Sequence, residues 1–223
     1  MKPFTRAVVV TGERAEFRRA ARPGIFECIF YPEESLKPTS PSLMLAVVLA
    51  TGMVSQAALA AKSDSCAHCH GTDGNSSSGA FPTLAGQNKE YLLKQMKDFK
   101  EERRKNPMMS PSIKILAEED MAELAEYFSS QSILRGSSKP DPALVSQGKA
   151  VADEFQCVAC HQAGFKGLKE FPRLSRQKLP YLMKQLKDFK EGTRNNDNGV
   201  MAPMAQKLSD EQIQAVAYYL TSL

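Results

Sequence analysis

The 223-residue chain carries 29 Lys and Arg against 25 Asp and Glu, which gives a formal net charge of +4. From residue 61 onward the counts are 22 and 20, so part of the basic excess lies in the first 60 residues. A nearly neutral protein of this kind gives no support for nucleic-acid binding.

The first 60 residues are predicted to form a leader rather than part of a fold. A continuous apolar run covers 43–54, Lys37 supplies a positive charge before it, and a small-x-small cleavage signal ends at Ala60. These features predict a secretory signal peptide with cleavage after Ala60. The alternative is a retained membrane anchor, for which the apolar run is short.

Residues 1–35 are Arg-rich and show no apolar periodicity. A chain that started at Leu36 would have a charged n-region and an ordinary signal length. We therefore suspect that residues 1–35 are not translated, and mapping the translation start would test this hypothesis.

A five-residue pattern occurs twice after the leader. Residues 66–70 and 157–161 both read C-x-x-C-H, which is the attachment signature of a c-type haem. Two thiols on one helical turn can form thioethers with the two haem vinyl groups, and the His that follows can bind the iron as proximal ligand. We predict two haem c groups, attached through Cys66, Cys69, Cys157 and Cys160, with His70 and His161 as proximal iron ligands.

A redox dithiol or half of a zinc site would also use C-x-x-C. A dithiol motif would occur once and does not need the His. A zinc site needs a fourth ligand, and after residue 60 the only His outside the two ligand positions is His68. The fifth Cys, Cys28, lies in the leader, so no pair is left for a disulfide. Because c-type haem is attached outside the cytoplasmic membrane in bacteria, the motifs and the signal together predict a periplasmic protein.

The chain after residue 60 repeats itself. Residues 81–84 match 171–174, and residues 91–101 match 181–191, with an offset of 90 that becomes 91 at the Cys motifs and 92 toward each C-terminus. Two tandem domains with small changes in loop length explain these offsets. We predict a first domain over 61–131, a linker containing Gly, Ser and Pro over 132–142, and a second domain over 143–223.

Each copy is predicted to be mostly helical, which places the protein in the all-α class. Apolar residues recur at helical spacing in 89–101, 118–130 and 210–223, and no convincing strand alternation appears. Ser209 and Gln212 predict a capping box at the last helix, whereas the first copy has Ala117 there and loses the cap. Domains this small bury little surface, so each should fold poorly without its haem.

The sixth ligand of each iron is predicted to be a Met thioether, because His68 is badly placed to reach across its own haem. Four residues compete for this role: Met108, Met109, Met201 and Met204. Only Met109 and Met201 recur in both copies, seven residues before an aligned Leu. We therefore predict His/Met ligation through this pair, with core packing as the alternative role of either side chain.

Pro82 and Pro172 also recur, each about a dozen residues after its His. A ligating His usually donates its other N–H to a carbonyl, so these loops are candidates for supplying the acceptor. A simple turn is the alternative.

The repeated order C-x-x-C-H, F-P-x-L, a Y-L-x-K-Q-[ML]-x-x-F helix and M-x-P-x-x-x-x-L resembles the dihaem cytochrome c4 family over essentially the whole chain after residue 60. The resemblance implies two tandem class I cytochrome c domains, each wrapped around one covalent haem, with export to the periplasm and loose membrane association. It implies His/Met ligation, which transfers to His70 with Met109 and to His161 with Met201. One departure is Gln162, where the first copy has Gly71.

The resemblance further implies an electron carrier and not an enzyme. Its redox partners would be a quinol-oxidising complex and a terminal oxidase or reductase. Two alternatives stay open: a dihaem enzyme of the peroxidase or thiosulfate-oxidising type, and an electron-transfer subunit of a dehydrogenase complex. Lysines of the two matching helices could guide docking to an acidic partner or form a solvated face: Lys94, Lys97, Lys100, Lys184, Lys187 and Lys190.

Overall fold

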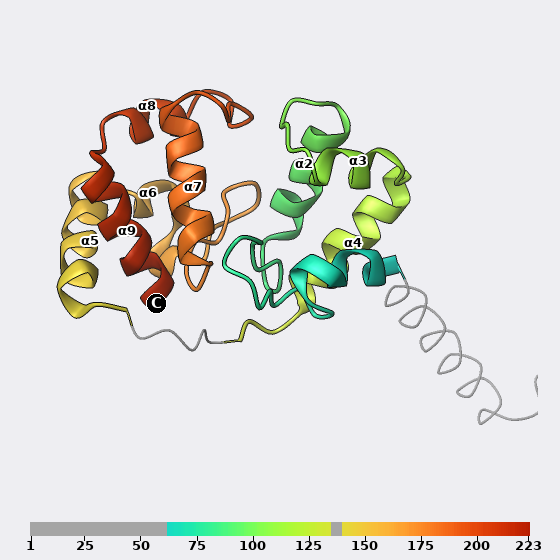
Figure 1. Cartoon of the computed structure of the whole chain (residues 1–223), viewed down its shortest axis with the longest axis horizontal. Helices are drawn as coiled ribbons and strands as arrows, with labels where there is room; N and C mark the ends of the chain where they lie inside the picture. Colours follow the sequence, from blue (N-terminus) through green and yellow to red (C-terminus); the bar gives the residue numbers. More distant parts are fainter. Residues whose placement is uncertain (1–61, 135–139) are drawn as a thin grey trace, which may run out of the picture. The chain divides into compact units, whose positions relative to one another are not determined.

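The computed structural model describes residues 62–134 and 140–223. The predicted leader with its cleavage site at Ala60, and residues 135–139 of the predicted linker, lie outside the described residues. Within the described ranges the elements are helical, and the only β pairing there is an isolated bridge between Leu168 and Phe171 (Figure 1). The predicted all-α class is therefore confirmed. We call 62–134 the first repeat and 140–223 the second repeat.

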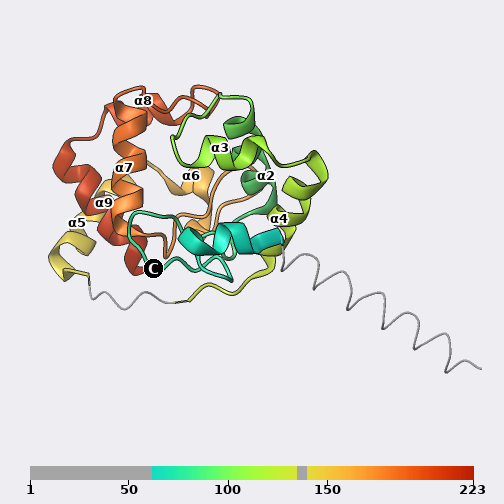
Figure 2. The same ribbon diagram turned by 45° about the vertical axis from the view of Figure 1, so that its right-hand side comes forward.

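The first repeat is built from four helical segments. Residues 62–70 are helical, and α2 (Lys89–Lys100), α3 (Met109–Lys114) and α4 (Glu118–Ser130) follow. Figure 2 shows the segment 62–70, in teal, beside the start of α4, where Lys62 pairs with Asp120 at 2.7 Å. Apolar residues of α2, α3 and α4 form the core, which consists of Leu92, Phe99, Ile113, Met121, Leu124, Ala125 and Phe128.

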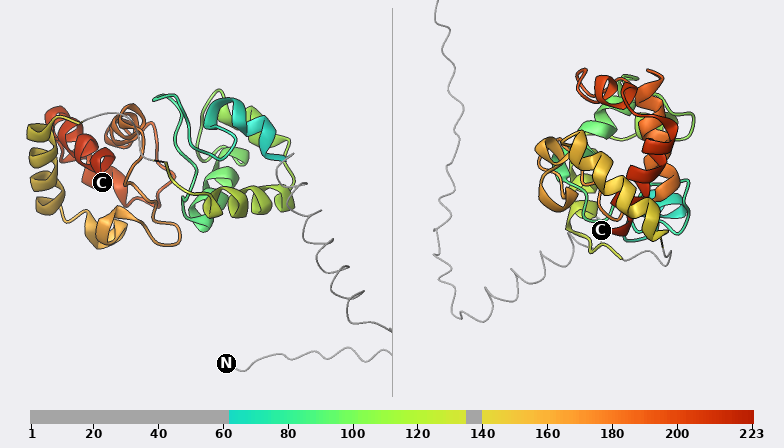
Figure 3. Two further views of the ribbon diagram at one scale, coloured as in Figure 1. Left: turned by 90° about the horizontal axis from the view of Figure 1, so that it is seen from below. Right: turned by 90° about the vertical axis from the view of Figure 1, so that its left-hand side faces the viewer.

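The second repeat contains α5 (Pro142–Glu154), α6 (Val158–His161), a 3₁₀ turn (Ala163–Phe165), α7 (Leu179–Lys190), α8 (Met201–Gln206) and α9 (Asp210–Ser222). Asp141 caps α5 by accepting a hydrogen bond from Ala143 N–H at 2.8 Å. Helices α5 and α9 lie side by side and α7 packs on α9 (Figures 1 and 3). Their buried faces form a continuous core with Phe165.

The two last helices start differently, as the sequence predicts. At α9, Gln212 N–H donates to Ser209 Oγ at 3.2 Å and Ser209 N–H donates to Gln212 Oε1 at 2.8 Å. At α4 the Ala117 side chain accepts nothing, but Ala117 N–H still donates to Asp120 Oδ2 at 3.3 Å. The first repeat thus loses one half of the capping box and keeps the other.

The repeats contact each other through a polar network in which aligned residues exchange partners. Arg104 donates to Gln185 at 2.6 Å and to Tyr181 at 3.1 Å, both in the second repeat. Its aligned partner Arg194 donates to Gln95 and to Tyr91 in the first repeat, each at 3.1 Å. The same contact, from an Arg of one repeat to a Tyr and a Gln of the other, is therefore formed twice.

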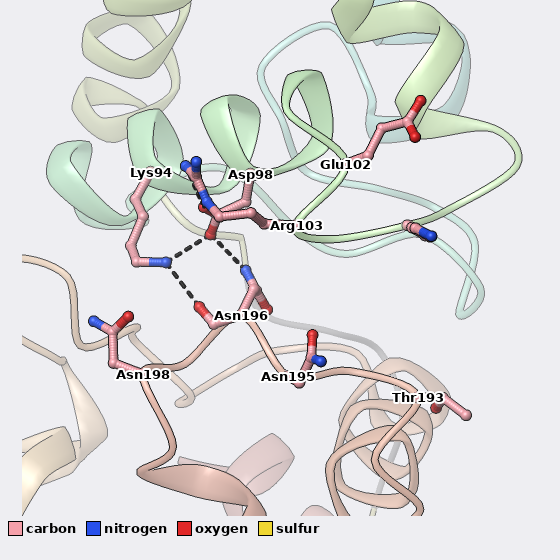
Figure 4. A pocket seen from close by; sticks show the side chains of 9 residues that line it. Lys94, Asp98, Glu102, Arg103, Thr193, Asn195, Asn196 and Asn198 are labelled. Atoms are coloured by element: carbon pink, nitrogen blue, oxygen red, sulfur yellow. Dashed lines mark hydrogen bonds and ion pairs between the residues drawn. The ribbon is translucent and has the colours of Figure 1, made fainter.

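Asp98 breaks this symmetry. Its side chain is 1 % exposed and accepts hydrogen bonds from Lys94 at 2.6 Å, from Arg103 at 2.8 Å and from Asn196 of the second repeat at 2.6 Å (Figure 4). Burial alone would raise the pKa of Asp98, but these three hydrogen bonds outweigh it and hold the pKa below its usual range. The aligned Asp188 accepts from side chains of its own repeat, Lys184 and Gln185.

An open polar cavity of about 520 Å³ lies beside Asp98 (Figure 4). Its lining comes from both repeats and consists of Lys94, Asp98, Glu102, Arg103, Lys105, Thr193, Asn195, Asn196 and Asn198. None of these residues is a Cys, His or Met. The cavity is therefore separate from the predicted haem sites.

The lysines of α2 and α7 bind groups of this chain. Lys94 bridges to the second repeat by donating to Asn196 O at 2.7 Å, and the others pair within their own repeat. These pairs are Lys97 with Glu118, Lys100 with Leu116 O, Lys184 with Asp188, and Lys187 and Lys190 with Asp210. Because partners within the chain already explain these lysines, no docking partner is needed to account for them. The pairing therefore favours the solvated-face interpretation. Among the described helices none has the length and apolar character to cross a membrane.

Candidate haem sites

The first candidate site lies at the end of the helical segment 62–70. Cys66 and Cys69 are free thiols one helical turn apart, and Cys66 packs against the core around Leu124. His70 closes the segment with 5 % of its surface exposed. Its Nδ1 lies 2.9 Å from Pro82 O, and its Nε2 is buried without a hydrogen-bond partner. A buried ring nitrogen with no partner is the position that a metal ion would take.

The second candidate site repeats this arrangement on α6. Cys157 and Cys160 are free thiols, and His161 ends the helix with 5 % of its surface exposed. His161 Nδ1 lies 3.0 Å from Pro172 O. Pro82 and Pro172, which the sequence offers as candidate acceptors beside the alternative of a simple turn, therefore supply the carbonyls that orient the two imidazoles.

The electrostatics of both sites suit neutral imidazole. Burial lowers the pKa of His70 and of His161 by more than the hydrogen bond to the Pro carbonyl raises it. A neutral ring that donates through Nδ1 keeps the lone pair of Nε2, which is the form that binds a metal.

The first thiol of each motif does not resemble the reactive thiol of a redox dithiol. Burial raises the pKa of the Cys66 thiol and of the Cys157 thiol, whereas redox dithiols depend on a lowered pKa. In each motif a half-buried thiol close in sequence to a buried His fits a covalently attached haem.

Met109 and Met201 occupy the same place in each repeat, at the first residue of α3 and of α8 (Figure 1). Asn106 Oδ1 accepts from Met109 N–H at 3.0 Å, and Asp197 Oδ2 accepts from Met201 N–H. Met108 is 55 % exposed, whereas Met109 is half-buried and packs against the core. This agrees with the alignment that pairs Met109 with Met201, and iron ligation by these two side chains stays a prediction.

Some residues around the sites were not found by sequence reasoning. Asn106 and Asp197 hold the Met loops, but the two-residue change in loop length hides their correspondence. Gln87 and Gln177 bind the loops that follow Pro172 and Pro82 across the contact between the repeats. Their shared offset of 90 could have singled them out, but the chemistry of a lone Gln is not specific.

Gln162 adopts the backbone conformation that favours glycine. Its φ is +64° and its ψ 166°, and Gly71 takes φ +81° at the same place in the first repeat. We expect Gln162→Gly to stabilise the holoprotein by about 1 kcal/mol. A non-glycine residue in this backbone region costs on the order of 1–3 kcal/mol, and the larger conformational entropy that Gly loses on folding offsets only part of the strain that is relieved. Guanidinium unfolding measures the change.

The matched control for this prediction is Gly71→Ala. A Cβ there would lie 2.6 Å from Asn75 O, so this variant should lose stability. Unchanged or lower stability of Gln162→Gly would contradict the assigned strain.

Comparison with known proteins agrees with this geometry. The family model described as cytochrome c matches residues 56–132 and again 145–223. Cytochrome c4 of Pseudomonas aeruginosa is 41 % identical over 174 residues, which cover 73 % of this chain and 86 % of that protein. A thiosulfate dehydrogenase electron acceptor of Stutzerimonas stutzeri is 34 % identical over 175 residues, covering 71 % and 78 % of the two chains.

A solved structure shares the arrangement of the whole pair of repeats. The crystal structure of reduced recombinant cytochrome c4 from Pseudomonas stutzeri superposes with a TM-score of 0.70 at 38 % identity, covering 74 % of this chain and 97 % of that one. Together with the C-x-x-C-H motif in each repeat, these matches show that the chain belongs to the cytochrome c4 family, as an electron carrier with two cytochrome c domains and two haem c groups.

Proposed function

We propose that this protein carries single electrons through the periplasm, from a quinol-oxidising complex to a terminal oxidase or reductase. In this proposal, thioether bonds from Cys66 and Cys69 hold one haem, and bonds from Cys157 and Cys160 hold the other. His70 with Met109 would hold one iron, and His161 with Met201 would hold the other. The observation that carries the proposal is that both repeats contain the same buried His, oriented by the same Pro carbonyl.

The residues of each site support one-electron transfer rather than substrate chemistry. The haem, when bound, supplies an iron that alternates between its ferric and ferrous forms. A thioether ligand favours the ferrous form and so raises the potential, and a second strong ligand leaves no open position for peroxide or oxygen. The half-buried position of Met109 against the core suits such a ligand.

Export follows from the same chemistry. The proposal places the mature protein after Ala60, with domains over 61–131 and 143–223 joined by the linker 132–142. Support for the division into two domains comes from the family model, whose two matches cover 56–132 and 145–223. Attachment of c-type haem outside the cytoplasmic membrane requires a leader, and the leader would place the carrier in the periplasm.

A second candidate for the electron donor comes from one group of relatives. A thiosulfate dehydrogenase electron acceptor is 34 % identical to this chain. The donor would then be a sulfur-oxidising dehydrogenase, and the chemistry of this chain would be unchanged. Reduction of the purified protein by each donor enzyme in turn separates the two candidates.

The proposed function predicts two covalent haems and no open iron. The intact mass of the exported protein should exceed the mass of the chain from Ala61 by two haem groups. The reduced native protein should not bind carbon monoxide, because in this proposal a His and a Met would hold each iron and leave no open position. A mass with one haem, binding of carbon monoxide, or peroxide turnover at enzyme-like rates would contradict the carrier proposal.

A further inference from the structure

One peptide group in each repeat connects the proximal His to a glutamine of the other repeat. In the Pro82–Thr83 peptide, the carbonyl oxygen of Pro82 lies 2.9 Å from His70 Nδ1. The N–H of the same peptide group donates to Gln177 Oε1 at 2.7 Å. His70 is thus linked to the second repeat through a single planar amide.

The second repeat contains the same arrangement in reverse. The carbonyl oxygen of Pro172 lies 3.0 Å from His161 Nδ1, and the N–H of the Pro172–Arg173 peptide donates to Gln87 Oε1 at 2.7 Å. Gln87 and Gln177 are aligned at the offset of 90. Each candidate haem site is therefore linked, through one peptide group, to a Gln of the opposite repeat.

Each glutamine is held firmly in place. Gln177 Nε2 donates to Thr83 O at 2.9 Å, and Gln87 Nε2 donates to Arg173 O at 3.0 Å. Both side-chain oxygens also accept from the next residue of their own chain segment, Lys178 or Asn88. The two glutamines are each 4 % exposed, and Thr83 and Arg173 are each 3 % exposed. The contact is buried, so its hydrogen bonds are strong and polarise one another.

Polarisation of the peptide has a definite direction. Amide resonance couples the N–H and the C=O of one peptide group. When Gln Oε1 accepts from the N–H, electron density moves to the carbonyl oxygen, which becomes a better acceptor for the imidazole N–H. A stronger hydrogen bond to Nδ1 makes the imidazole a more basic ligand, and a more basic ligand favours ferric iron.

We propose that Gln177 and Gln87 are positioning residues that lower the reduction potential of the haem in the opposite repeat, Gln177 through His70 and Gln87 through His161. The inference rests on the proposed iron ligation by these two His residues. It makes the contact between the repeats part of the redox tuning of both haems. A partner that broke both glutamine hydrogen bonds to the Pro peptides would raise both potentials.

The alternative is that the glutamines only hold the repeats together. Both roles predict that removing a glutamine weakens the contact. Only the proposed role predicts a change in reduction potential that is confined to one haem. That haem belongs to the repeat that was not mutated.

The test uses the full holoprotein with Gln177→Leu and, separately, Gln87→Leu. Haem potentials are resolved by redox titration of the haem methyl resonances in NMR spectra. Gln177→Leu should raise the potential of the haem in the first repeat and leave the other unchanged, and Gln87→Leu should do the reverse. In the reduced proteins, hydrogen exchange should accelerate at Thr83 N–H in the first variant and at Arg173 N–H in the second.

Two further variants guard against a general effect on stability. Gln185→Leu removes contacts with Arg104 and Arg194 without touching either Pro peptide, so it should shift neither potential by a comparable amount. Gln177→Glu keeps an oxygen acceptor for Thr83 N–H and should hold the potential of the first haem at or below its parent value.

Three results would overturn the proposal. They are equal shifts of both haems in one Leu variant, a shift of the same size in Gln185→Leu, or unchanged potentials in both Leu variants. A parent spectrum without His ligation would instead refute the proposed function, so the two failures are distinguishable.

Discussion

Replacing Met109 or Met201 by Ala is expected to remove about half of the weak near-infrared charge-transfer band that marks Met-ligated ferric haem. Each repeat would contribute one such ligand, so the double variant should lose the whole band. The potential of the affected haem should fall by on the order of 100 mV or more, because axial ligands cover a range of about 0.8 V and a thioether lies toward its upper end. Carbon monoxide should then bind the affected iron in the reduced protein.

Met108→Ala and Met204→Ala are the matched controls for this prediction. Met108 lies one residue before the start of α3 and is 55 % exposed, so its loss should leave the band intact. Met204 lies within α8, three residues after Met201. Loss of the band in Met204→Ala and its retention in Met201→Ala would show that the alignment of the two repeats is wrong.

The features that the sequence predicts are those carried by local chemistry and by repetition. The C-x-x-C-H spacing indicates haem without any structure, because thioether attachment constrains both the thiols and the His. Apolar periodicity predicts α2, α4 and α9 within a residue or two of their observed ends. The internal repeat separates Met109 from Met108, since a position shared by both copies is less easily explained by packing alone.

The contact between the repeats could not be predicted in the same way. Hydrogen bonds such as Gln87 to Arg173 join residues 86 positions apart, and no local pattern marks a Gln as an interface residue. The asymmetry at Asp98 depends on Asn196, which comes from a loop that differs in length between the repeats. The hydrogen bond from Ala117 N–H to Asp120 does not depend on the side chain of residue 117, so the loss of Ser at this position does not reveal that half of the capping box remains.

Gly148→Ala is expected to destabilise the second repeat by about 3 kcal/mol, at the upper end of the cost of overpacking. Gly148 lies in α5 where this helix meets α9, as Figure 3 shows for the two helices. A Cβ at Gly148 would overlap the Ala215 carbonyl oxygen, lie 2.5 Å from the Ala215 carbonyl carbon and lie 2.8 Å from Tyr219 Cβ. Backbone atoms of a packed helix cannot rotate away as a flexible side chain can, so α5 and α9 must separate.

Separation of α5 and α9 should also disturb the candidate haem site, because α5 leads directly into the motif at 157–161 and α9 carries much of the core. A domain of about 80 residues has on the order of 4–12 kcal/mol of stability in total, so the expected loss is a large share of it. Guanidinium unfolding of the holoprotein, followed at the near-infrared band, measures the loss. Gln147→Ala, one residue away on the exposed side of α5, should change stability by no more than about 0.5 kcal/mol. Equal stabilities of Gly148→Ala and Gln147→Ala would mean that α5 and α9 do not approach as closely as the structure shows.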